Sequence, residues 1–170
     1  MKLTMQPAIS LDGFIATPDG DSESWVNPAD EARYQAVVER CGCVIVGYTT
    51  FKQYEESFND YQNVMIFVCT SKTDLKDTEK VKYLGGAAVD IIQTIERDYG
   101  FEELVACGGG EVNGMLADAG LINEIVISIQ PKVLGEGIPL FGKHTPDLNL
   151  ELLSVNQEIA GVIQNHYLVI

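Results

Sequence analysis

Positive charge is scarce in this sequence. Eleven lysines and arginines stand against 25 aspartates and glutamates, and the net charge is −14. Nucleic acids and anionic membrane surfaces bind to basic faces, so we expect neither as a partner. A bound phosphate group has to be held mainly by backbone N–H groups and a few local cations, because the overall field is unfavourable to it.

Cysteine frameworks and long apolar runs are also missing. There are four cysteines, none in a C-x-x-C pair, and Cys41 and Cys43 are only two residues apart, so neither a metal site nor a disulfide pattern is recognisable. The acidic loop of residues 17–24 lacks the glycine and the final glutamate of an EF-hand, and we expect it to be solvated. No run is long enough to span a bilayer, and residues 1–10 lack the apolar stretch of a signal peptide. We therefore expect a cytoplasmic protein without a metal.

What is present fits one domain over residues 1–170, with 46% hydrophobic and 21% charged residues. Apolar runs that predict strands alternate with helix-type patterns along most of the chain. Strands are predicted over 2–9, 44–46, 64–69, 80–84 and 104–106, and helices over 28–40, 49–55, 88–99 and 110–119. After Gly120 the pattern changes to strands over 123–130, 148–159 and 161–170. This order predicts an α/β fold: a mainly parallel sheet with helices on both faces and an antiparallel C-terminal hairpin.

The chain is organised around Leu104 to Leu116, where an apolar strand runs into three glycines and then into a helix. Bare backbone at a helix N-terminus favours a phosphate group. Neither common nucleotide motif matches, because Asn113 occupies the third glycine position of G-x-G-x-x-G and no Gly-Lys-Ser/Thr is present. A tight turn in which strand and helix pack closely is the alternative, and this stretch alone leaves both open.

The other predicted strand ends favour the phosphate interpretation. In a parallel sheet of this kind, ligands bind beyond the carboxyl ends of the strands. Each of four successive strands ends in glycine, hydroxyl or lysine residues, in the segments Gly47–Thr50, Thr70–Lys72, Gly85–Gly86 and Cys107–Glu111. We expect these ends to form one long polar groove suited to an extended phosphorylated cofactor.

Four motifs resemble one known family in the right order over most of the chain. They are Ser10–Ala16 (SLDGFIA), Gly47-x-x-Thr50, Gly108–Gly110 and the stretch from Ile129 to Phe141. Together they resemble the dihydrofolate reductase-like fold, specifically the reductase domain of bacterial riboflavin biosynthesis, the RibD C-terminal domain, and its stand-alone relatives. The resemblance implies a three-layer α/β/α architecture and NADPH as hydride donor.

The resemblance also implies which residues bind the cofactor: Ala8, Ile15, Gly47, Thr49, Thr50, Ser71, Lys72, Gly108, Gly109, Gly110, Glu111 and Val112. Ala8 and Ile15 would line the nicotinamide. Gly47, Thr49 and Thr50 would contact one end of the diphosphate. Ser71 and Lys72 would bind the adenosine side with its 2′-phosphate. The segment Gly108–Val112 would cradle the diphosphate. Tyr48 stands where the family often has an arginine, which leaves Lys72, with Lys52 beside it, as the expected cation.

Two carboxylates are the candidate catalytic residues. The segment Trp25-x-x-Pro28-Ala29-Asp30 resembles the part of dihydrofolate reductases that carries the pterin-binding acid. A carboxylate at Asp30 would bind an amino-pyrimidine edge and help to protonate the ring nitrogen. Asp12 would make a polar contact beside the substrate. In the alternative interpretation Asp30 is only a favourable residue in a helix first turn, and Asp12 only a turn residue.

The expected activity is hydride transfer from NADPH to a small heterocyclic substrate, as in 5-amino-6-(5-phosphoribosylamino)uracil reductase. A pterin or dihydrofolate reductase is the alternative within the enzyme class. Other classes left open are a nucleotide-binding protein without catalysis and an oligomeric structural protein. A ribose phosphate would need a cation, for which Arg33 and Lys132 are candidates. The zinc motif of the deaminases is absent, so we expect a reductase only. The apolar C-terminal strands and the glycine-rich loop 135–142 indicate a homodimer.

Overall fold

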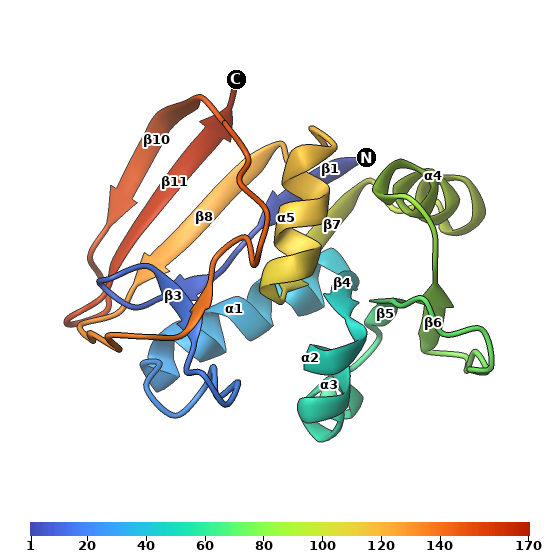
Figure 1. Cartoon of the computed structure of the whole chain (residues 1–170), viewed down its shortest axis with the longest axis horizontal. Helices are drawn as coiled ribbons and strands as arrows, with labels where there is room; N and C mark the ends of the chain where they lie inside the picture. The colour runs from blue at the N-terminus through green and yellow to red at the C-terminus, as the bar shows by residue number, and fades with distance from the viewer.

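The computed structural model describes all 170 residues and contains one large sheet (Figure 1). Its strands follow the order β10-β11-β8-β1-β7-β4-β5-β6, with β2 beside β8, and β3 and β9 form a separate pair. The strands are β1 (Lys2–Met5), β2 (Ala8–Ile9), β3 (Phe14–Ala16), β4 (Cys43–Gly47), β5 (Met65–Cys69), β6 (Val81–Leu84), β7 (Glu103–Gly108), β8 (Glu124–Ile129), β9 (Ile138–Pro139), β10 (Leu150–Asn156) and β11 (Ile163–Val169).

The pairing confirms the predicted fold class. β1 is parallel to both β7 and β8, and β4, β5 and β6 continue the parallel part of the sheet beyond β7. β11 runs antiparallel to β8, and β10 antiparallel to β11, so the last two strands extend one edge as a hairpin. The sheet is therefore mixed and mainly parallel, with the antiparallel hairpin at its C-terminal end.

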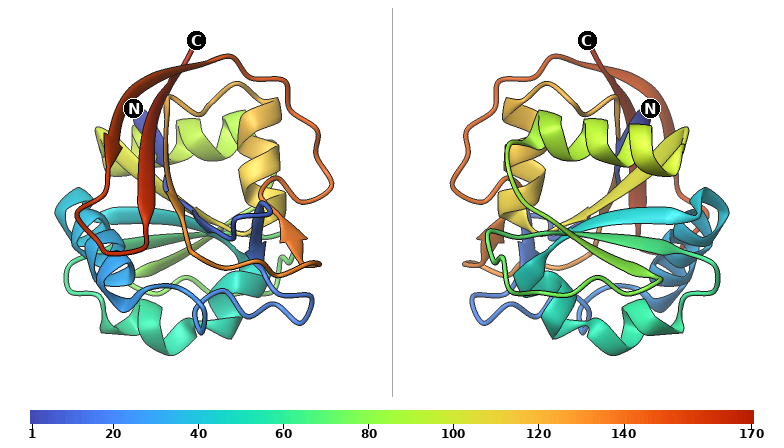
Figure 2. Two further views of the ribbon diagram at one scale, coloured as in Figure 1. Left: turned by 90° about the vertical axis from the view of Figure 1, so that its left-hand side faces the viewer. Right: turned by 90° about the vertical axis from the view of Figure 1, so that its right-hand side faces the viewer.

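Helices cover both faces of the sheet (Figure 2). One core cluster joins the sheet to α4 (Ala88–Tyr99) and α5 (Gly110–Asp118). A second cluster joins the opposite face to α1 (Pro28–Cys41), α2 (Tyr48–Gln53) and α3 (Glu55–Asp60). This is the three-layer α/β/α arrangement that the family resemblance implied. None of the helices is both long and apolar enough to cross a membrane.

Strand β4 shows why its sequence has no polar alternation. Val44 and Val46 belong to the core on the α1 face, whereas Cys43 and Ile45 belong to the core on the α4 face. All four are fully buried. A strand covered on both sides needs apolar residues at every position, as the continuous run Val44 to Val46 predicted.

Several element boundaries follow from capping residues that the sequence displays. Asn27 caps α1 by accepting a hydrogen bond from the Ala29 N–H at 2.9 Å, and Pro28 follows in the first turn. Gly42 ends α1 with φ of 77°, and Gly100 ends α4 with φ of 68°. Glycine is favoured at these left-handed positions because it has no Cβ. Both helices therefore lie within about one residue of their predicted ranges.

Two local predictions were wrong. The single strand predicted over residues 2–9 is divided into β1 and β2 at Gln6 and Pro7, because proline has no N–H to donate to a ladder. The helix predicted over 49–55 begins at Tyr48, after Gly47, which makes no side-chain capping bond, and ends at Gln53. The Thr50 hydroxyl instead accepts a hydrogen bond from the Gly109 N–H.

Candidate cofactor and substrate cleft

A cleft of about 790 Å³ opens where β4, β5 and β7 end. The segments that follow these strands line it together, as the sequence predicted: Gly47–Thr50, Thr70–Lys72, and Cys107 with Gly109–Val112. Gly85 and Gly86, at the end of β6, are not among the lining residues, and neither is Gly108. The polar groove therefore involves three of the four predicted strand ends.

The glycine turn after β7 lies directly against the start of α2. The Gly109 N–H donates to Thr50 Oγ1 at 3.1 Å, and Gly108 has φ of 95°. A Cβ on Gly110 would lie 2.6 Å from the Gly142 nitrogen and 2.7 Å from the Pro139 oxygen. Close packing thus explains Gly110, whereas Gly109 exposes bare backbone along the cleft. Close packing therefore accounts for Gly110 but not for Gly109, which also lines the cleft.

Lys72 is the only basic residue that lines the cleft. Its Nζ lies 4.2 Å from the centroid of the Tyr48 ring, a cation–π contact between the ends of β4 and β5. Lys52, the other expected cation, pairs with Glu55 and does not line the cleft. Glu111, at the start of α5, pairs with Lys143 at 3.0 Å, and this contact lowers the pKa of the Glu111 carboxyl.

Ala8 and Ile15 line the cleft from β2 and β3. Both residues are half-buried. Their apolar side chains add an apolar wall to the groove. This wall comes from the N-terminal part of the chain, whereas the rest of the groove is formed by later strand ends. The structure thus places both in the lining of the cleft that Gly109 and Gly110 also line.

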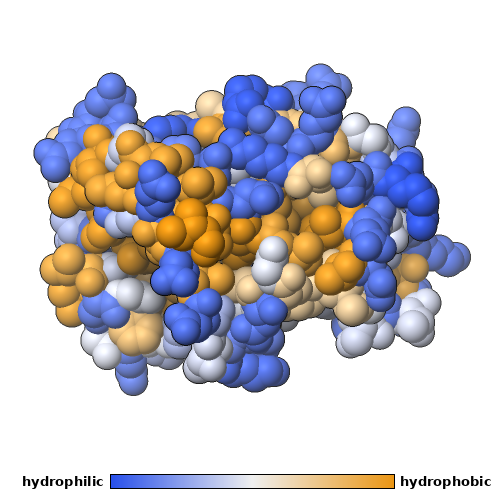
Figure 3. Space-filling model, turned by 90° about the horizontal axis from the view of Figure 1, so that it is seen from above, coloured by the Kyte–Doolittle hydropathy of each residue, from blue (hydrophilic) through white to orange (hydrophobic).

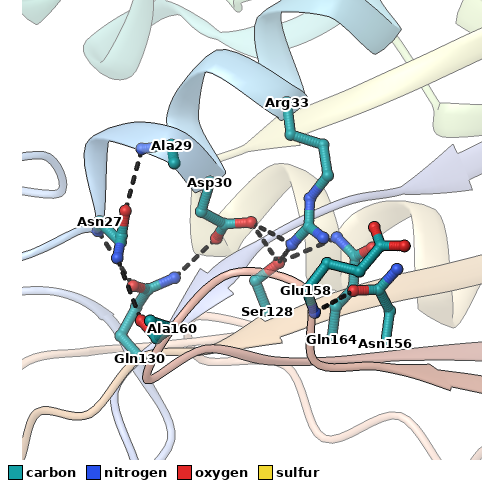
Figure 4. A network of polar contacts seen from close by, with 10 residues as sticks. All are labelled: Asn27, Ala29, Asp30, Arg33, Ser128, Gln130, Asn156, Glu158, Ala160 and Gln164. Atoms are coloured by element: carbon teal, nitrogen blue, oxygen red, sulfur yellow. Dashed lines mark hydrogen bonds and ion pairs between the residues drawn. The ribbon is translucent and has the colours of Figure 1, made fainter.

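Asp30 lies at the centre of a buried polar network that joins α1 to β8 (Figure 4). Its side chain is 5% exposed. Oδ1 accepts hydrogen bonds from the Ser128 hydroxyl at 3.0 Å and from the Arg33 guanidinium, and Oδ2 accepts one from Gln130 Nε2 at 2.6 Å. Gln130 Oε1 in turn accepts from the Asn27 N–H at 3.0 Å. The carboxylate also lines the cleft, so one side chain has structural partners and access to a ligand.

Asp12 occupies a different place. It lies outside the cleft lining and accepts hydrogen bonds from the backbone N–H groups of Leu134 at 3.1 Å and Gly135 at 2.7 Å. The Ser10 hydroxyl and these two N–H groups lower the pKa of Asp12 to about 2. Asp12 therefore joins its own turn to the turn at Leu134 and Gly135, away from the cleft. Arg33 and Lys132, the candidate phosphate ligands, are not cleft-lining residues either.

The sequence did not predict two of the polar side chains that line the cleft, nor the partners of Asp30. Tyr34 and Asn113 line the cleft, and the Tyr34 hydroxyl and Asn113 Oδ1 are buried without a hydrogen-bond partner. Burial raises the pKa of the Tyr34 hydroxyl, and it raises the pKa of the neighbouring Cys107 thiol to about 11. The only sequence signal for Tyr34 was its spacing: it follows Asp30 by four residues, so the two side chains share a helix face. The partners of Asp30 on β8 had no local signal at all.

The strand order and the cleft at the strand ends define a dihydrofolate reductase-like fold. Dihydrofolate reductase from Enterococcus faecalis, solved as a complex with NADP(H) and RAB-propyl, superposes with a TM-score of 0.72 at 16% identity over 99% of this chain and 96% of its own. The deaminase/5-amino-6-(5-phosphoribosylamino)uracil reductase of Thermotoga maritima gives 0.80 at 15% identity, over 99% of this chain and 56% of its own. At these identities the likeness concerns the fold alone.

The chain belongs to the RibD C-terminal domain family, whose model matches residues 1–164. A protein of Shewanella sp. PV-4 that is assigned to riboflavin biosynthesis is similar over its whole length. It shares 28% identity, covering 100% of this chain and 99% of its own, with a TM-score of 0.84. The family resemblance that the motifs indicated is thereby confirmed.

Proposed function

We propose that this protein is an NADPH-dependent reductase that transfers a hydride to a pyrimidine- or pterin-type heterocycle. The observation that carries the proposal is a single cleft that joins the glycine turn and Lys72 at one end to the Asp30 carboxylate at the other. An extended dinucleotide and a small heterocycle can meet in such a cleft. Membership of the RibD C-terminal domain family supports the same activity.

The residues along the strand ends fit a dinucleotide. A Cβ at Gly47 would lie 3.1 Å from Val112 Cγ2, and one at Gly109 would lie 3.1 Å from Thr50 Oγ1, so bare backbone lines the cleft at both positions. There, N–H groups at the start of α5 would hold the diphosphate, with Thr49 and Thr50 hydroxyls beside them. Ser71 and Lys72 would hold the 2′-phosphate. In this proposal Gly108 shapes the turn and Glu111 flanks it.

NADPH, when bound, supplies the hydride, and the chain positions and shields it. Ala8 and Ile15 would form the wall against which the nicotinamide ring rests. Three of the roughly four acceptor positions of the Asp30 carboxylate are used within the protein, which leaves one on Oδ2 for a substrate N–H. Asp30 would thus orient the heterocycle and assist its protonation. Both the ribosylaminouracil and the pterin class fit this role.

The test is a titration of the purified chain with NADPH, followed by reduced-nicotinamide fluorescence, and then NADPH oxidation with heterocyclic substrates. Saturable binding followed by turnover supports the reductase. Binding without turnover favours a nucleotide-binding protein that does not catalyse. No binding contradicts the proposal as a whole.

Replacing Lys72 with methionine is expected to weaken NADPH binding about tenfold and to leave NADH binding nearly unchanged, because only NADPH carries the 2′-phosphate. Methionine keeps an apolar stem over the Tyr48 ring. Lys52→Met, which removes the same charge outside the cleft, is the matched control and should change neither affinity. An equal loss for NADPH and NADH would place the 2′-phosphate elsewhere.

We also propose a homodimer formed through the β10–β11 hairpin. Leu152, Leu153 and Val155 of the edge strand β10 are 53%, 47% and 51% exposed. They belong to the end of the molecule where hydrophobic surface gathers in Figure 3. An open, apolar edge strand is unusual in a monomer. Sedimentation should give twice the chain mass, and Leu152→Lys should give the monomer; a monomeric parent chain contradicts the dimer.

A reducing, cytoplasmic location is part of the same proposal. All four cysteines are free thiols, including the closely spaced Cys41 and Cys43. Burial raises the pKa of the Cys69 thiol to about 12, which keeps it protonated and unreactive. Free thiols of this kind are typical of proteins from reducing compartments.

A further inference from the structure

We propose that the substrate end of this cleft takes a neutral or cationic heterocycle without a phosphate group, and that it discriminates against the phosphorylated form of the same compound. We call this end the acidic chamber and define it by Glu23, Asp30, Glu31, Tyr34 and Tyr61, which line the cleft around α1 and the end of α3. The inference rests on the proposed reductase function and names the substrate class of the same site.

The acidic chamber contains no cation for a phosphate. Glu23, Asp30 and Glu31 all line it, whereas Lys72, the only basic residue of the whole cleft, lies at the end of β5 over the Tyr48 ring. Arg33 is the nearest arginine in sequence, but its guanidinium is engaged by Asp30 and does not line the cleft. Because Arg33 neutralises Asp30, a phosphate dianion here would meet the carboxylates of Glu23 and Glu31, neither of which is in an ion pair, and no free cation.

The N-terminus of α1 does not supply the missing positive charge. Its first free N–H, on Ala29, donates to Asn27 Oδ1 at 2.9 Å. The N–H groups of Asp30 and Glu31 donate to the Asn27 carbonyl at 2.9 and 3.1 Å. The first turn also carries two carboxylates of its own, which cancel the effect of the helix dipole on an approaching anion.

The negative field of the acidic chamber can be seen in the groups that face it. The pKa of Glu23 is raised by partial burial and, beyond that, by the charges of Glu31 and Asp21. The pKa of the Tyr61 hydroxyl is raised by burial first and then by negative charge that includes Glu31 and Glu23. Since the neighbouring carboxylates disfavour the charge of Glu23, a further anion beside it is disfavoured in the same way.

A neutral heterocycle does find partners in the acidic chamber. The Tyr34 hydroxyl is buried beside the Cys107 thiol, a weak hydrogen-bonding group, and has no oxygen or nitrogen partner in the protein, although it lines the cleft one turn after Asp30. Buried polar groups in native proteins are nearly always paired, so an orphan of this kind indicates a ligand atom. Asp30 Oδ2 offers an acceptor for an N–H of the ligand. Ring amides and amino groups therefore fit this space, and a phosphate does not.

The test measures direct binding by calorimetry of one matched pair, 5-amino-6-ribosylaminouracil with and without its 5′-phosphate, in the presence of NADP⁺. The dephosphorylated compound is expected to bind at least about tenfold more tightly at low salt, with the difference shrinking as ionic strength rises. In the double variant Glu23→Gln/Glu31→Gln this preference should fall about threefold or more. Glu102→Gln, an exposed glutamate at the amino end of β7, removes one charge outside the cleft and should change nothing.

Equal or tighter binding of the phosphorylated compound overturns the inference, and so does a preference that the double variant leaves unchanged. A dihydropterin is run in parallel as a second unphosphorylated probe. If neither ribosyl compound binds, binding of the dihydropterin supports the inference, and its failure to bind overturns the inference. These outcomes are separate from the failure of the proposed function, because cofactor binding and turnover are measured in their own experiments by nicotinamide fluorescence and NADPH oxidation.

Discussion

Alanine at Gly110 is expected to lower the melting temperature by about 10 °C, which corresponds to about 3 kcal/mol for a chain of this size. The added methyl group would lie 2.6 Å from the Gly142 nitrogen, 2.7 Å from the Pro139 oxygen and 2.9 Å from Gly142 Cα. All three are backbone atoms, so no side-chain rotation relieves the contact. The 139–142 loop would have to move away from the start of α5.

Gly109→Ala is the matched control for this prediction. It adds the same methyl group one residue earlier, where the only close atom is Thr50 Oγ1 at 3.1 Å, on a rotatable side chain. Thermal unfolding followed by circular dichroism should give a much smaller loss for Gly109→Ala than for Gly110→Ala. If both variants lose the same stability, steric fit against the 139–142 loop is not what requires glycine at position 110.

Asp30→Asn is expected to destabilise the fold by about 2 to 4 kcal/mol and to reduce turnover at least about 100-fold. The amide would turn an N–H₂ group toward the N–H₂ of Gln130, so that two donors face each other, and the ion pair with Arg33 would be lost. Denaturant unfolding measures the first effect, and NADPH oxidation under saturating cofactor measures the second.

The double variant Asp30→Asn/Gln130→Glu separates the two roles of this side chain. A glutamate at position 130 can accept from the new amide at position 30 and still accept from the Asn27 N–H, so the donor–acceptor pattern of the network is restored. We expect stability to recover and turnover to stay low, because the carboxylate has moved away from its position on α1. Recovery of turnover together with stability would mean that Asp30 only supports the fold.

Local sequence signals predicted the fold well where neighbouring residues alone determine the element. The helix patterns over 28–40 and 88–99 and the continuous apolar run of β4 each specify an element without reference to distant residues. The division between β1 and β2 was not predicted, because the pairing of β2 with β8 depends on residues that follow more than a hundred positions later.

The candidate site was predictable to the extent that it is built from strand ends. Loops after neighbouring parallel strands must meet, which placed Thr50, Lys72 and Gly109 at one cleft. The partners of Asp30 were not predictable, because Ser128 and Gln130 face it only through the register of β8 across the sheet. The same holds for Asp12, whose partners Leu134 and Gly135 lie in a distant turn.

The central position of β1 has a consequence for synthesis of the chain on the ribosome. Lys2 to Met5 pair with Glu103 to Ala106 on one side, and the end of β1 pairs with the start of β8 on the other. At translation speeds of roughly 5–20 residues per second, the first strand waits on the order of 10 s for its neighbours. Leu3 and Met5, both fully buried in the folded protein, therefore stay without their sheet partners until residues 103–106 and the start of β8 have been synthesised.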